Sequence, residues 1–158
     1  MHDPGAGRMA RRKLRTKTNT KPVEYADGEP SAFAAMLGGL IEANVDSRAD
    51  RKKDFDSLVA RVGIWVTDID EGVTLDFRKG SLVVYNGLQA KRDLTIRAQA
   101  GTVMNLSNLK IGLLGMPIYY DKVGRSVAMK LVQGKLRIEG LFGNFATLNT
   151  VTRIFSVQ

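Results

Sequence analysis

The spacing of apolar residues changes near residue 60, and this change constrains the fold more than any other feature of the sequence. Between residues 61 and 98, apolar side chains recur at every second position, the period of a β-strand with one buried face. The turn-forming sequences "DEG" and "RKGS" separate the first three segments. We therefore expect consecutive hairpins that form an antiparallel meander. The strands are expected at 61–69, 73–77, 82–85 and 93–98.

Helical spacing of apolar residues occurs on both sides of these strands. Before them, the apolar stripe Phe33, Leu37 and Ile41 follows Ser31, a residue type that caps helices. A further strand, "KLRIE", is expected at 135–139, with Leu136 and Ile138 on its buried face. The expected order is two helices, four strands, two helices, one strand and one helix, and such runs of like elements predict an α+β fold. The helices are expected at 32–43, 48–60, 101–109, 122–133 and 144–157.

The chain lacks the side chains on which many enzymes depend. It has no cysteine, and its single histidine is His2. Disulfides, thiol nucleophiles, Ser-His-Asp catalysis and most zinc sites are therefore excluded. Asp68, Asp70 and Glu71 do not follow the spacing of a calcium-binding EF-hand loop. We expect a protein without catalytic activity, metal or other cofactor.

Positive charge is concentrated at the N-terminus. The chain has a formal net charge of +8, and residues 1–21 contain seven basic residues and one acid. We interpret residues 1–30 as a basic, disordered arm and residues 31–158 as the folded domain. Three roles remain open for the arm: a solubilising tail, contact with an anionic membrane, or contact with nucleic acid. The candidate contact residues are Arg11, Arg12, Lys13, Arg15 and Lys17.

Localisation is expected to be cytoplasmic. The sequence has no apolar run of the roughly 18 residues that a membrane span needs. The pair Arg11-Arg12 is not followed by the apolar region of an export signal. Outside residues 1–21 the charges nearly balance, so a nucleic-acid-binding domain surface is not expected.

Three motifs, in this order, carry a family resemblance. They are "DSLVARVGIWVTDIDEGVTLDF" at 56–77, "DLTIRA" at 93–98 and "GKLRIEG" at 134–140. With them, residues 49–157 resemble the sterol carrier protein type 2, or nonspecific lipid-transfer, family. The basic arm lies outside the family pattern, and the segment 110–125 is longer than its usual counterpart.

The resemblance implies a five-stranded, mainly antiparallel sheet with helices on one face and an apolar cavity between them. The implied ligand is a fatty-acid, sterol-like or isoprenoid lipid. The alternative is a structural or interaction subunit with a filled core, which docks a protein partner through the surface around Trp65 or through the arm. The candidate cavity residues are Ile64, Val66, Leu75, Phe77, Met104, Leu114, Met116, Ile118, Met129, Phe142 and Phe145.

Overall fold

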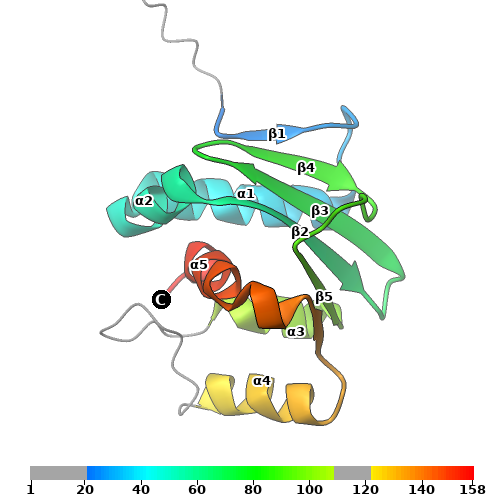
Figure 1. Cartoon of the computed structure of the whole chain (residues 1–158). Helices are drawn as coiled ribbons and strands as arrows, with labels where there is room; N and C mark the ends of the chain where they lie inside the picture. Colours follow the sequence, from blue (N-terminus) through cyan, green and yellow to red (C-terminus); the bar gives the residue numbers. More distant parts are fainter. Residues whose placement is uncertain (1–20, 109–121) are drawn as a thin grey trace, which may run out of the picture.

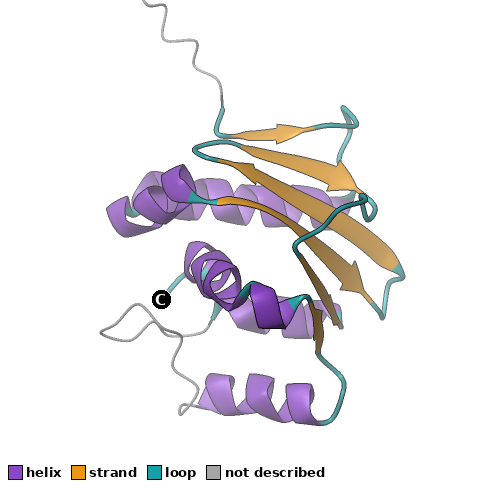
Figure 2. Cartoon of the chain, viewed as in Figure 1, coloured by secondary structure: helices purple, strands orange, loops and turns teal. Residues whose placement is uncertain are grey.

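The structure, a computed structural model, describes residues 21–108 and 122–158. A twisted sheet is covered by helices on one face (Figures 1 and 2). The strands are β1 (Val23–Tyr25), β2 (Val59–Val66), β3 (Glu71–Arg78), β4 (Leu82–Asn86), β5 (Leu94–Ala98) and β6 (Arg137–Glu139). The helices are α1 (Ala32–Ser47), α2 (Ala49–Ser57), α3 (Ala100–Ser107), α4 (Lys122–Val132), the 3₁₀-helix η1 (Leu141–Gly143) and α5 (Phe145–Phe155).

The α+β class expected from the sequence is confirmed, but the sheet differs from the expected one. It has six strands in the order β1-β4-β3-β2-β5-β6. The strand β1 is parallel to β4, and β5 is parallel to β2, so the sheet is mixed. The expectation of five mainly antiparallel strands is therefore wrong in strand number and in the pairing of β5.

The additional strand comes from the range assigned to the basic arm. In β1, Val23 is 5% exposed and packs into the core. The main chain on either side of β1 is also bonded to β4, because Leu82 N–H donates to the Pro22 carbonyl and Ala26 N–H donates to the Val84 carbonyl. The last part of the range 1–30 is thus part of the sheet. Local sequence did not reveal this because the strand contains three residues and one buried apolar side chain.

The connection between β4 and β5 explains why the meander does not form. Residues 87–93 cross the face of the sheet opposite the helices and place β5 beside β2. Thr74 Oγ1 donates to the Gly87 carbonyl and accepts from Gln89 N–H, both at 2.8 Å. Gly63 leaves room for the crossing, since a Cβ added there would lie 2.5 Å from Arg92 Cδ. The seven-residue link is therefore a crossover and not a hairpin turn.

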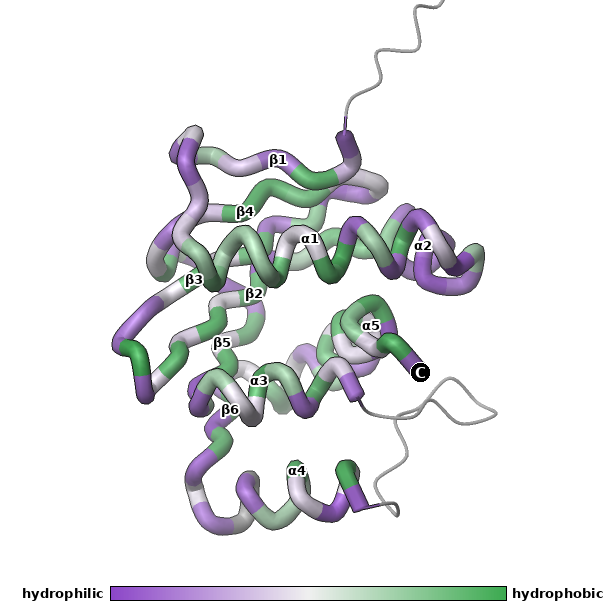
Figure 3. The backbone as a smooth tube through the Cα atoms, turned by 180° about the vertical axis from the view of Figure 1, so that it is seen from behind, coloured by the Kyte–Doolittle hydropathy of each residue, from purple (hydrophilic) through white to green (hydrophobic). Residues whose placement is uncertain are grey.

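The core lies between the sheet and the helices. In the reverse view, α1 and α3 lie in front of the strands (Figure 3). Alternate residues of the central strands face these helices, and Ile64, Leu75 and Phe77 are each at most 1% exposed. The Phe77 ring meets Phe55 of α2 edge-on, with ring centroids 6.2 Å apart. This layer accounts for the period of two in the sequence.

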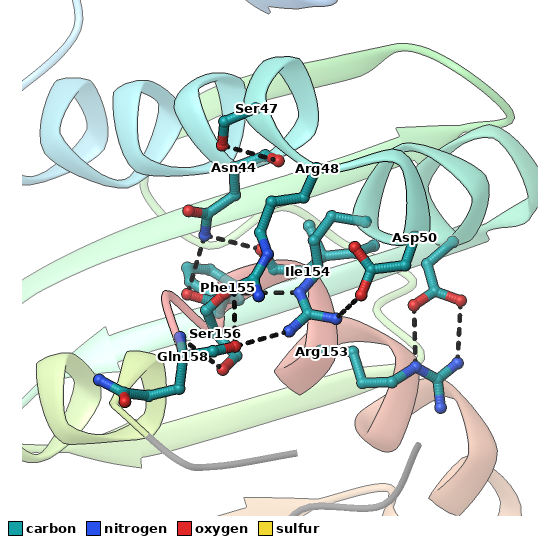
Figure 4. A network of polar contacts seen from close by, with 11 residues as sticks. Asn44, Ser47, Arg48, Asp50, Arg153, Ile154, Phe155, Ser156 and Gln158 are labelled. Carbon is teal, nitrogen blue, oxygen red and sulfur yellow. Dashed lines mark hydrogen bonds and ion pairs between the residues drawn. The ribbon is translucent and has the colours of Figure 1, made fainter. Parts of the chain in front are cut away.

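The C-terminal end of α5 is held against α1 and α2 by polar contacts (Figure 4). Asn44 Nδ2 donates to the carbonyls of Ile154 and Phe155 at 2.9 and 3.0 Å. Arg153 forms a two-bond ion pair with Asp54, at 2.8 and 3.0 Å. The Asn44 bonds satisfy carbonyls that the end of a helix leaves unpaired, and the ion pair joins α5 to α2.

Candidate functional site

The candidate site is an apolar space between the sheet and two helices, α3 and α5. Its walls come from β2, β5 and both helices, whose positions in the fold are shown in Figure 1. The volume of this space is about 10 Å³, roughly the room that one water molecule needs. The described residues therefore do not enclose a cavity large enough for a lipid. The lining residues are Ile64, Ile96, Val103, Leu106, Val151, Thr152 and Phe155.

Strand register and helical spacing bring these walls together. Ile64 of β2 pairs with Ile96 of β5, so two β-branched side chains lie next to each other on the helix-facing side. On α5, Val151 and Phe155 lie one turn apart and face the same strands. Thr152 Oγ1 donates to the Leu148 carbonyl of its own helix at 2.8 Å, so its hydroxyl does not require a partner inside the space. The chemistry of the site is accordingly that of an apolar surface.

Four of the predicted cavity residues lie in the helix-facing layer of the sheet. Ile64 lines the apolar space. Val66, Leu75 and Phe77 are buried on the same side but do not line it. Met104 lies on α3 and is half-buried.

The other predicted cavity residues divide into two groups. Met129, Phe142 and Phe145 are on the surface, with 57%, 107% and 54% of their area exposed. Leu114, Met116 and Ile118 lie outside the described residues, as do the basic residues proposed for the arm. That these side chains contact a ligand stays a prediction.

The prediction missed six residues that line the space. Five of them come from α3 and α5. Both helices were expected from the sequence, but their side chains were not predicted to form a wall. The register Ile64–Ile96 would have placed the sixth, but it required the parallel pairing of β5 with β2, which local periodicity does not reveal.

A charged network lies on the opposite face of the sheet. Asp76 accepts from Arg61 Nη2 at 3.0 Å and from Arg78 Nη2 at 2.8 Å. Burial raises the pKa of Asp76, but the hydrogen bonds and charges of the two arginines outweigh burial and hold it below its ordinary value. This carboxylate is therefore an ionised structural group. Within the described ranges, no cluster of three or more histidine or acidic residues is placed to hold a metal.

Comparison with known proteins supports a fold assignment. No protein-family model matches the chain, and no curated protein matches it by sequence. The solved structure of a UbiJ-SCP2 ubiquinone synthesis protein superposes with a TM-score of 0.55 and 14% identity, over 78% of this chain and 91% of that chain. Sterol carrier protein 2 gives a TM-score of 0.48 and 12% identity, over 80% of this chain and 92% of that one. The inverting sec-alkylsulfatase Pisa1 from Pseudomonas sp. gives a TM-score of 0.47 and 15% identity. The match covers 76% of this chain but only 15% of the sulfatase.

The chain thus has the fold of a sterol carrier protein 2-like domain, and the resemblance expected from "GKLRIEG" is confirmed at the level of the fold. None of the helices in the described residues is long and apolar enough to cross a membrane.

Proposed function

We propose that this chain is a non-catalytic lipid-binding protein that holds an acyl, sterol-like or isoprenoid ligand between the sheet and helices α3 and α5. The observation that carries the proposal is the wall of six apolar residues and one threonine formed by β2, β5, α3 and α5 in a sterol carrier protein 2-like fold. One structural neighbour is named as a ubiquinone synthesis protein. Ubiquinone has an isoprenoid tail, which favours a ligand of that kind.

Binding of a lipid requires the wall to open, because the volume of the space is only about 10 Å³. Helix α3, with eight residues, is the shorter of the two helices in the wall. Asp68 Oδ1 accepts a hydrogen bond from Ala100 N–H at its start, and Lys130 Nζ of α4 donates to Thr102 Oγ1, both at 2.9 Å, so opening must break these bonds or move α4 with α3. Each ligand CH₂ group that leaves water contributes about 0.8 kcal/mol. A long chain therefore has enough binding energy to displace a short helix and still bind in the micromolar range after the ordering costs of binding.

A second candidate function is a structural or interaction subunit with the same fold. The small volume of the apolar space favours it, as does the exposure of Phe142 and Phe145 near the start of α5. In this case the core is permanently filled and the exposed aromatic side chains contact a protein partner. The first candidate predicts that the purified protein carries a bound lipid, and the second predicts that it carries none.

Native mass spectrometry of the purified protein, followed by lipid extraction, tests the first candidate directly. A bound lipid of defined mass supports it. If the protein carries no lipid and does not bind a fluorescent fatty acid or a ubiquinone analogue, the proposal is wrong and the interaction subunit is favoured.

A pair of variants locates the binding site. Val151→Phe adds volume inside the apolar space, so we expect it to weaken binding of the fluorescent fatty acid about tenfold. Val45→Phe is the control, because Val45 is equally buried on α1 but does not line the space. Both changes overpack the core and lower stability by about 1–3 kcal/mol. Equal affinities in the two variants would place the ligand elsewhere.

A further inference from the structure

Three large side chains form a row across the sheet on the face away from the helices. Trp65 of β2 is in register with Arg97 of β5, and Arg97 is in register with Arg137 of β6. Since neighbouring residues in a strand point to opposite faces, the buried Ile64 and Ile96 place these three on the outer face. The row lies near the edge of the sheet formed by β6.

The row borders an open hollow of about 390 Å³. Lys135 is a third cation in its wall, and Thr67 and Gln99 add polar groups. This volume is in the range of small-molecule sites. The lining contains three basic residues and no acidic residue.

The turn after α4 fixes the position of Lys135. Gly134 adopts a left-handed conformation, with φ of +72°. The main-chain N–H groups of Lys135 and Leu136 both donate to the Lys130 carbonyl, at 2.9 and 3.0 Å. This arrangement is the end of a helix closed by glycine. The first glycine of the "GKLRIEG" segment thus positions a cation at the hollow.

The charges of the row are only partly neutralised. Arg97 Nε lies 2.8 Å from Glu139 Oε1. Within residues 21–108 and 122–158, Lys135 and Arg137 form no ion pair. Two arginines directly opposite each other on neighbouring strands repel and weaken strand pairing. The hollow therefore combines an unfavourable pairing with uncompensated positive charge, and an anion would relieve both.

We propose that this hollow binds a phosphate group, with Arg97, Arg137 and Lys135 as the cations and Trp65 beside the substituent that carries the phosphate. The three cations and Glu139 leave a local charge of +2, which matches the −1.5 to −2 of a phosphate monoester near pH 7. Guanidinium groups suit phosphate because they donate two parallel hydrogen bonds. The hollow is larger than a phosphate group, so it has room for a substituent. The phosphate belongs either to a free phosphate compound or to a phospholipid headgroup.

Trp65 is the single tryptophan of the chain, so its fluorescence reports on the hollow directly. We expect phenyl phosphate, titrated at constant ionic strength, to change the Trp65 emission saturably. Arg137→Gln should weaken this binding at least tenfold, as loss of a charge-assisted hydrogen bond does. Arg125→Gln is the matched control, since it removes the same charge from an exposed residue of α4 outside the hollow. The control should change the affinity less than twofold.

Vesicles identify the source of the phosphate. In the same assay, vesicles with phosphatidic acid are compared with vesicles of phosphatidylcholine alone. Saturation by phenyl phosphate supports a free phosphate compound. A response to phosphatidic acid vesicles alone, weakened by Arg137→Gln and not by Arg125→Gln, supports a headgroup.

Two results would overturn the proposal: no saturable response to either probe, or equal weakening by both variants. The test is independent of lipid binding between the sheet and the helices, because the two sites lie on opposite faces of the sheet.

Discussion

At the scale of single residues, Gly140 shows why the segment "GKLRIEG" ends in glycine. Its φ is +84°, and a Cβ added there would lie 2.3 Å from the Asp93 main-chain oxygen. Any larger residue would both strain the backbone and push β6 away from the residue that precedes β5. The glycine is thus required by the close approach of two main chains.

Gly140→Ala should lower the free energy of unfolding by roughly 2 kcal/mol or more, because it adds a clash to an unfavourable φ. Chemical denaturation measures the change. Gly143→Ala is the control, since a Cβ at Gly143 meets no atom within 4 Å and its φ is not positive. Equal losses in the two variants would contradict this account of Gly140.

Asp76 makes the stability of the protein depend on acid pH. The arginines at 61 and 78 hold its pKa in the folded protein below the ordinary value of 3.8. The stabilisation from ionised Asp76 is therefore fully present above pH 3.8 and is lost as the pH falls through the lower pKa of the folded state. We expect the difference in unfolding free energy between the wild type and Asp76→Asn to shrink below pH 3.8. A constant difference between pH 6 and pH 2.5 would show that ionisation of Asp76 is not responsible.

At the scale of elements, β6 separates a buried face from a solvent face within three residues. Ile138 is half-buried on the helix-facing side, and Arg137 is exposed on the other. Ile138→Asp should lower the free energy of unfolding by about 3 kcal/mol, because it places an unpaired charge against the core. Arg137→Asp should change it by less than about 0.5 kcal/mol. Similar effects of the two substitutions on denaturation curves would mean that the face assignment is incorrect.

The basic arm can be shortened by deleting residues 1–20, which spares every residue of β1. Deletion of residues 1–20 removes six basic residues and one acid, and it spares Pro22, whose carbonyl accepts a hydrogen bond from Leu82. We expect unchanged melting temperature and lipid affinity but weaker binding to anionic vesicles, with a difference that decreases as salt rises. Flotation of vesicles at two salt concentrations measures this.

Nucleic acid is the competing partner of the arm, and it predicts a different salt dependence. Up to six phosphates neutralised on duplex DNA would give a log–log salt slope near −5, which the deletion should abolish. If the full-length and truncated proteins behave alike in the vesicle and DNA assays, the arm is a solubilising tail.

At the scale of the whole molecule, the sheet separates two chemical environments. The helix-facing side is apolar, and its buried residues form the core together with α1 and α5. The outer side carries the network around Asp76, the crossover at 87–93 and the basic hollow beside Trp65. The sheet thus has an apolar core on one face and polar or charged groups on the other.

Local sequence was sufficient for most elements of the fold. The period of two predicted β2 to β5, and the apolar stripes predicted α1, α3, α4 and α5, because burial of one face depends on spacing alone. The segment "GKLRIEG" predicted β6 and the orientation of its buried residues. Among the described elements, β1 (Val23–Tyr25) and the 3₁₀-helix η1 (Leu141–Gly143) were missed, since three residues carry too little pattern.

Strand partners and the volume between layers came from the tertiary structure alone. The parallel pairing of β5 with β2 depends on a loop that crosses two strands, and the sequence of that loop carries no signal for its destination. The space between the sheet and α3 and α5 is set by how seven side chains from four elements pack. A hydrophobic pattern specifies which residues are buried but not whether their packing leaves room for a ligand, because volume is a property of contacts between distant segments.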